Sequence, residues 1–192
     1  MARFFGRKRD DEYQEAARKL AEGDPKAAID QLRTILLEKP KHVNAMVTLA
    51  VALIQVQKEP RIGSPETVEA MKLLDKAGEM RPKDPVPVFN KGVCLRNLGL
   101  LEEALECFEG ALKLEKRLPI AIVHMAEISY ELERWEDAVH LARLALIRDP
   151  GLEEGLGWVP DAMKKAGYLD DEGNVIHTPW ENEDMAGDWT RQ

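Results

Sequence analysis

The stretch from residue 87 to residue 116, PVFNKGVCLRNLGLLEEALECFEGALKLEK, decides how this chain folds. A second stretch of the same pattern, IAIVHMAEISYELERWEDAVHLARLALIRDP, occupies residues 120–150. Small or apolar residues recur at an interval of 34 in the pairs Gly92 and Ala126, Ala104 and Ala138, Phe108 and Ala142, and Ala111 and Ala145. A fixed interval of this length indicates a repeated structural unit.

The same pattern extends towards the N-terminus. Ala16 and Ala50 are also 34 residues apart, whereas the series that begins at Ala28 returns at Ala70 after 42 residues. The two halves of a repeat are twelve residues apart from Ala16 to Ala28, but twenty apart from Ala50 to Ala70. An eight-residue insertion therefore lies inside the second repeat, within KEPRIGSPET and around Lys58–Gly63. Repeat proteins tolerate an insertion that is confined to one turn.

Each half of a repeat has the pattern of a helix. Apolar residues recur at helical spacing from Tyr13 to Leu20, and Asp10 and Asp11 are expected to cap this first helix and to supply its first-turn acids. Later helices are expected to open where proline follows a capping residue, at Asp24-Pro25 and Ser64-Pro65. Prolines also close second helices, at Pro40, Pro82 and Pro150. No stretch alternates with period two for long enough to be a strand, so the predicted class is all-α.

In these residues the chain resembles the tetratricopeptide repeat (TPR) family. Gly92 and Leu95 stand at the family's small and large sites of the first helix. The second-helix sites are held by Ala104, Phe108 and Ala111, and the fourth copy adds Trp135 in the turn and Pro150 at the end. The resemblance implies a right-handed superhelical solenoid of four helix-turn-helix repeats over residues 9–152. The predicted repeats are 9–42, 43–84 with the insertion, 85–118 and 119–152.

Two further segments follow the repeats. Residues 153–169 keep helical spacing and resemble the capping helix that TPR arrays place over their last repeat, although Pro160 must break or kink it. Residues 170–192 carry seven acids against one arginine and are predicted to be a disordered tail. Two interpretations of Trp180 and Trp189 stay open. Either one ring packs on the solenoid, which we favour, or both anchor a docking segment or fill the groove in cis.

The composition excludes several classes of function. Asp and Glu number 35 against 27 Lys and Arg, so the net charge of -8 argues against a nucleic-acid binder. Cys94 and Cys107 give no CxxC spacing and no disulfide framework, which fits a reducing compartment. No apolar run is long enough to span a membrane, and the N-terminus lacks a secretory signal, so a cytoplasmic location is expected. The basic head at residues 1–8 would give at most marginal membrane contact through Phe4 and Phe5.

The family resemblance places the first helix of each repeat on the concave inner face. The site residues it implies there are mostly apolar: Tyr13, Val47, Val51, Ile54, Phe89, Asn90, Val93, Val123 and His124. Ala17 and Thr48 are implied on the same face, with Thr48 as a hydrogen-bonding group. One subclass of the family grips a chaperone's C-terminal carboxylate with basic residues, but the corresponding positions here are Tyr13, Val47, Val86 and Ile120. That clamp is absent, and an apolar or amphipathic segment is the expected ligand. Alternatively, these side chains simply pack against one another or against the capping helix.

Nothing in the sequence indicates catalysis. The four histidines are scattered, at His42, His124, His140 and His177. No phosphate-binding glycine loop and no metal-ligand cluster is present in the sequence, so we expect no enzyme, cofactor, metal or small-molecule substrate. Two functions stay open. One is an adaptor that binds a peptide or amphipathic helix of a partner protein in the concave groove. The other is a self-assembling scaffold that oligomerises when the head or tail enters a neighbouring groove.

Overall fold

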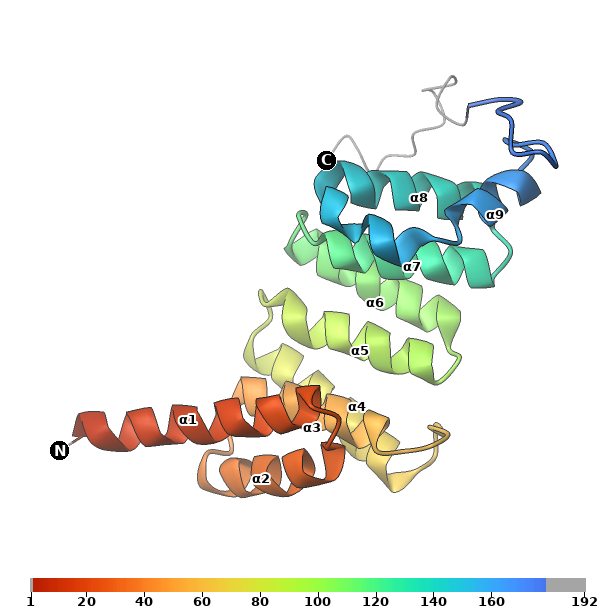
Figure 1. Cartoon of the computed structure of the whole chain (residues 1–192). Helices are drawn as coiled ribbons and strands as arrows, with labels where there is room; N and C mark the ends of the chain where they lie inside the picture. The colour runs from red at the N-terminus through yellow and green to blue at the C-terminus, as the bar shows by residue number, and fades with distance from the viewer. Residues whose placement is uncertain (1, 179–192) are drawn as a thin grey trace. The chain divides into compact units, whose positions relative to one another are not determined.

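A computed structural model shows that the chain folds into helices (Figure 1). It describes the backbone of residues 2–178 and the side chains of residues 11–178. The chain divides into two compact units, Met1–Lys116 and Arg117–Gln192. The first unit contains three helix pairs: α1 (Ala2–Ala21) with α2 (Pro25–Glu38), α3 (Val43–Gln55) with α4 (Pro65–Met80), and α5 (Pro85–Asn97) with α6 (Leu101–Leu114). The second contains α7 (Pro119–Glu131), α8 (Trp135–Arg148), the 3-10 helix η1 (Pro150–Leu156) and α9 (Val159–Lys165).

Side-chain caps that are followed by proline start three of the α-helices, α2, α4 and α5. The carboxylate of Asp24 accepts a hydrogen bond from the Ala27 backbone N–H at 3.1 Å, and Ser64 Oγ accepts one from Thr67 at 3.2 Å. Asp84 caps α5 in the same way. In all three helices the cap is followed by proline, whose missing N–H needs no partner in the first helical turn. The predicted starts at Asp24-Pro25 and Ser64-Pro65 are thereby confirmed.

Small side chains lie where the helices pack most closely. Ala104 of α6 and Ala138 of α8 are both 0 % exposed, as the repeat interval predicts. A Cβ atom added at Gly92 of α5 would lie 2.9 Å from the ring of Phe108, which is itself fully buried. The helix axes therefore approach closely because these positions carry almost no side chain.

The link between α3 and α4 is the longest within a helix pair. It runs over residues 56–64, where the 42-residue interval places the insertion. Ser64 Oγ donates a hydrogen bond to Gln57 Oε1 at 2.6 Å. Gln57 Nε2 in turn donates to the backbone oxygen of Leu53 and to Thr67 Oγ1, whose residue is 1 % exposed. These bonds join the two ends of the insertion to α3 and α4.

The first helix begins earlier than the sequence predicts. α1 starts at Ala2, so most of the predicted head at residues 1–8 is helical, and Asp10 and Asp11 stand inside the helix instead of capping it. Residues 2–10 contain no proline, and Gly6 is their weakest helix former. Extending the helix through them therefore costs little. None of the helices that the structure describes has the length and apolarity needed to cross a membrane.

The segment after the fourth helix pair also differs from the prediction. The expected capping helix at residues 153–169 consists of two elements, η1 and α9. Pro160 does not kink a long helix but stands in the first turn of α9, where proline is tolerated. Both elements contact α8, so they cover the last helix pair as a capping segment does.

Residues 170–178 are ordered, in contrast to the predicted disorder of the tail. Leu169 and Val175 form an isolated antiparallel bridge. The carboxylate of Asp170 accepts hydrogen bonds from the backbone N–H groups of Asn174 at 2.7 Å and Glu172 at 3.0 Å. Local hydrogen bonds thus hold this acidic turn although it has no helical periodicity. Trp180 and Trp189 lie outside the described residues.

Candidate functional site

A depression of about 380 Å³ opens on the first unit, on the side of its first helices. Its lining comes from α1, α3, α5 and the turn before α5. The lining residues are Tyr13, Leu20, Asn44, Val47, Thr48, Val51, Asp84, Val86 and Asn90. We call this depression the groove. Since α3 contacts both α1 and α5, the groove is built across three successive first helices.

Helical spacing explains why these residues share one surface. On α3, Asn44, Thr48 and Val51 recur at intervals of four and three, which keeps them on one face. On α5, Val86 and Asn90 are four residues apart. The opposite faces of these helices pack inwards. Ala50 of α3 and Gly92 of α5 are buried there.

The groove has an apolar floor and an open apolar rim. Val47 is 6 % exposed and forms the floor, whereas Val86 is 49 % exposed. Tyr13 and Val51 are half-buried between them. Covering apolar surface of this kind with another apolar group is favourable, because it removes that surface from water.

Polar groups stand among these apolar side chains. The hydroxyl groups of Tyr13 and Thr48 are 3.2 Å apart and hydrogen-bonded. Asn44 Oδ1 accepts a hydrogen bond from Arg81 at 3.0 Å, and Asn90 Nδ2 donates one to the backbone oxygen of Val86 at 2.8 Å. Among the described residues this leaves Asn44 Nδ2 and Asn90 Oδ1 without hydrogen-bond partners. The groove therefore offers one amide donor and one amide acceptor.

The charge of the groove is small. Asp84 is the charged residue of its lining, and its carboxylate lies 3.5 Å from the guanidinium of Arg81. No three His, Cys, Asp or Glu side chains gather closely enough to hold a metal ion in the part of the chain that the structure describes. The arrangement suits the binding of an apolar side chain and a polar backbone.

The structure brings together four of the nine predicted site residues. Tyr13, Val47, Val51 and Asn90 line the groove. Ile54 is 2 % exposed and supports α3 from within.

The remaining predicted residues lie elsewhere. The ring of Phe89 packs edge-on against Phe108, with 5.5 Å between ring centroids, and Val93 is half-buried outside the lining. Val123 and His124 belong to the second unit. Val123 is 6 % exposed there, and His124 Nδ1 lies 3.4 Å from the carboxylate of Glu127.

Thr48, which the resemblance also implies on the inner face, lines the groove as well. The lining residues absent from the predicted site are Leu20, Asn44, Asp84 and Val86. The repeat interval contained a signal for two of them, because Asn44 and Val86 are 42 residues apart and hold the same position in successive repeats. From the sequence alone, Val86 stands out only as a position where the carboxylate clamp would need a basic residue. Asp84 had no such signal, since it lies in a turn.

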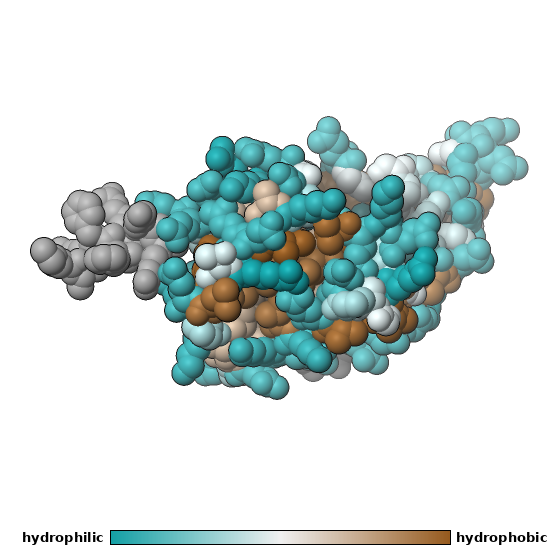
Figure 2. Space-filling view, turned by 90° about the horizontal axis from the view of Figure 1, so that it is seen from below, coloured by the Kyte–Doolittle hydropathy of each residue, from teal (hydrophilic) through white to brown (hydrophobic). Residues whose placement is uncertain are grey.

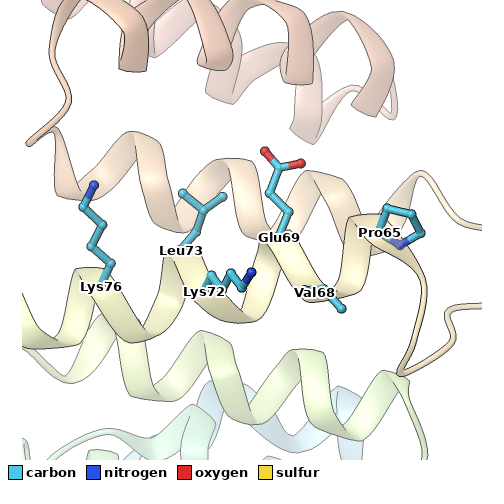
Figure 3. A pocket seen from close by; sticks show the side chains of 6 residues that line it. All are labelled: Pro65, Val68, Glu69, Lys72, Leu73 and Lys76. Atoms are coloured by element: carbon cyan, nitrogen blue, oxygen red, sulfur yellow. The ribbon is translucent and has the colours of Figure 1, made fainter.

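A second depression, of about 440 Å³, lies on α4. Figure 3 shows its lining side chains: Pro65, Val68, Glu69, Lys72, Leu73 and Lys76. They diverge across the surface of a single helix instead of converging on one point. Glu69 is engaged with Arg33 of α2 at 2.7 Å. This surface is therefore a weaker candidate than the groove.

An apolar area is also exposed at the N-terminal end of the first unit. Figure 2 views the molecule from below, from the side on which α1, α2 and α4 lie in Figure 1, and shows apolar residues framed by hydrophilic ones. On these helices, Leu37 of α2 is 83 % exposed. Apolar surface of this kind often marks protein contacts, but it has no arrangement of polar groups that would define a partner.

Neither the models of known protein families nor the curated protein sequences give a match to this chain. Solved structures do match. The thermophilic TPR protein TTC0263 of Thermus thermophilus is 20% identical with a TM-score of 0.70, and the match covers 80% of each chain. PilF of Pseudomonas aeruginosa is 19% identical with a TM-score of 0.70, over 83% of this chain and 69% of that one.

A chain in the structure of Naa15/Naa10 bound to HypK-THB matches with 19% identity and a TM-score of 0.61. The match covers 83% of this chain but only 23% of the chain in that complex. These likenesses confirm the predicted all-α solenoid of TPR type.

Proposed function

We propose that this chain is a protein-interaction adaptor whose groove holds an apolar or amphipathic segment of a partner protein. One observation carries the proposal. Partly exposed apolar side chains and amide groups from three successive first helices line the same groove. Val51 and Val86 offer apolar surface there, and Asn44 and Asn90 offer hydrogen bonds. A helix or extended segment that buries two or three apolar anchors would fit this surface.

The available energy is sufficient for a reversible complex. Burying one apolar side chain of this size is worth about 1.5–3 kcal/mol. Two or three such contacts give about 3–9 kcal/mol, and only the part that exceeds the entropy lost on association appears as affinity, so we expect a weak, reversible complex. Because Asp84 is already paired with Arg81, we expect the affinity to change little with salt concentration.

The structural likenesses support this class of function without specifying the ligand. One of the matching structures is a complex of several proteins, Naa15/Naa10 bound to HypK-THB. Helical repeat scaffolds present extended surfaces that are well suited to binding.

The test is Val86→Glu compared with Val68→Glu. Both valines are exposed to a similar extent, 49 % and 40 %, but Val86 lines the groove and Val68 lies on the outer surface of α4. Position 86 is in the first turn of α5, where an acid is favourable, so Val86→Glu should fold normally. Its carboxylate would have to lose its water beneath an apolar ligand, which is costly.

The measurement starts from a displayed peptide library, from which peptides that bind the wild type are selected and synthesised. Their affinity for each variant is then measured by calorimetry. We expect Val86→Glu to weaken binding about tenfold or more and Val68→Glu to leave it unchanged. Equal binding by all three proteins would place recognition outside the groove.

Self-assembly is the alternative. The apolar area at the N-terminal end of the first unit favours it, as does the exposure of Leu37 on α2. Sedimentation velocity over a range of concentrations distinguishes the two functions. A concentration-dependent oligomer that is lost with Leu37→Glu would support assembly through this end. A monomer at all concentrations would leave the adaptor as the function.

A further inference from the structure

The second unit contains a cluster of aromatic rings from three elements. The ring of Tyr130, on α7, lies 5.2 Å from that of Trp135, which begins α8. On another side it lies 4.9 Å from the ring of Trp158, just before α9. Tyr130, Trp135 and Trp158 are only partly buried, so the cluster is accessible from solvent. We call these three residues the aromatic cluster.

A positive charge occupies this cluster. Lys165 Nζ lies 4.3 Å from the ring centroid of Trp135 and 5.3 Å from that of Tyr130. The faces of aromatic rings attract cations, and tryptophan does so most strongly. The same ammonium group is 2.9 Å from the carboxylate of Asp161, one turn earlier on α9.

The carboxylate is itself held in position. The Tyr130 hydroxyl donates a hydrogen bond to Asp161 Oδ2 at 2.6 Å. This bond, together with Lys165, keeps the pKa of Asp161 below its ordinary value, and the partnership with Asp161 raises the pKa of Lys165. Both groups are therefore charged at neutral pH. Two aromatic faces and one oriented carboxylate together form a receptor for an ammonium group.

We propose that Tyr130, Trp135 and Asp161 form a binding site for the side-chain ammonium of a partner protein's lysine, and that Lys165 fills this site until the partner lysine displaces it. The site lies in the second unit and recognises charge, so it is independent of the groove. Because Asp161 accepts a hydrogen bond, the site favours a primary ammonium over a quaternary one, which has no N–H to donate.

Two observations favour exchange over a permanent internal contact. The side chain of Lys165 is 44 % exposed and belongs to a helix of seven residues, so it can swing into water without exposing a core. The indole N–H of Trp158, shielded from solvent beside Tyr130, has no acceptor among the described residues. An unsatisfied donor costs free energy, and a shift of the rings on binding would allow a carbonyl group of the partner to reach it.

The experiment removes the internal occupant. Lys165→Ala and Lys165→Gln are prepared in the full chain, and Lys164→Ala, the neighbouring exposed lysine, serves as the matched control. Folding is checked by circular dichroism. The probe is Nα-acetyl-lysine amide, titrated to millimolar concentration, and the readout is the indole N–H resonance of Trp135 in NMR spectra. Tetramethylammonium is titrated in parallel as the quaternary cation.

We expect Lys165→Ala and Lys165→Gln to bind the lysine probe about tenfold more tightly than the wild type and Lys164→Ala. Adding Asp161→Asn to Lys165→Gln should remove this gain and the preference over tetramethylammonium. The glutamine variant keeps the first half of the lysine stem and ends in a neutral polar group, so the test stands if the alanine variant is unstable. Absence of probe binding to both Lys165 variants, or equal binding to Lys164→Ala, would overturn the proposal.

Discussion

Gly92 stands where the ring of Phe108 leaves no room for a side chain. A Cβ atom at this position would lie 2.9 Å from Phe108 Cε1, closer than carbon atoms normally approach. Gly110, also inside a helix, has its nearest neighbour at 3.5 Å from the corresponding atom, an ordinary contact distance. Both glycines lower helix propensity equally, but only the packing around position 92 excludes a larger side chain.

We predict that Gly92→Ala lowers the free energy of unfolding by about 1–2 kcal/mol, because overpacking the buried ring outweighs the gain in helix propensity. Gly110→Ala should be neutral or stabilising by up to about 1 kcal/mol. Urea denaturation followed by circular dichroism measures both. If the two variants are equally stable, α5 and α6 are not packed as closely as the structure shows.

At the scale of elements, the turn after α9 depends on one carboxylate. The side-chain amide of Asn174 donates to Asp170 Oδ2 at 2.9 Å, and two backbone N–H groups donate to Oδ1. These hydrogen bonds, that from the Asn174 side chain first, lower the pKa of Asp170 below its ordinary value of 3.8. The lowered pKa means that the ionised form favours the ordered turn.

The turn should therefore be fully formed above the unfolded pKa of Asp170 and should open as the pH falls through the lower folded pKa. An NMR titration that follows the backbone N–H signals of Glu172 and Asn174 measures this. We expect the shared midpoint to lie below 3.8. Asp171→Asn lies within the turn but changes none of the three side-chain acceptor bonds of Asp170, so it should change the titration little. A midpoint at or above the ordinary value would show that the carboxylate does not order the turn.

At the scale of the whole molecule, the chain consists of two compact units, each with its own packed helices. The core cluster of the first unit reaches from Ala16 to Cys94, and the ring of Phe108 on α6 is buried as well. In repeat proteins stability is roughly the sum of repeat terms and nearest-neighbour terms. The first unit should therefore retain its fold when it is separated at a repeat boundary.

We predict that a fragment of residues 1–116 is helical and unfolds cooperatively on heating. A fragment of residues 1–100 should have a lower Tm, because it lacks α6 and leaves Gly92 and its neighbours on α5 without Phe108 to cover them. Thermal melts monitored by circular dichroism compare the two. Equal melting temperatures would mean that α6 adds nothing to the stability of the first unit.

How much of the fold followed from the sequence is clear from particular residues. The 34-residue interval identified Ala104 and Ala138 as buried packing sites, and both are fully buried. The starts at Asp24 and Ser64 were also predictable, because capping is a local interaction between a side chain and the next helical turn. The sequence did not predict that α1 extends through residues 2–10. Asp10 and Asp11 look like capping residues, but they lie inside the helix.

The candidate site was predictable only in part. The repeat position indicates which face of a helix turns inwards, and so Tyr13, Val51 and Asn90 were expected in the groove. It does not indicate how far a neighbouring helix covers each side chain, which is why Ile54 is buried while Val86 is open. The placement of Lys165 over Trp135 had no sequence signal at all.

The sequence by itself thus determined the repeated helix pair, because small residues at fixed intervals and capping groups act through short-range geometry that recurs in every copy. Only the tertiary structure decided which apolar side chains stay open and which charges meet aromatic rings. The physical reason is that exposure and charge pairing depend on the distances between helices that lie far apart in the chain. Those distances follow from the packing of all the helices in a unit together.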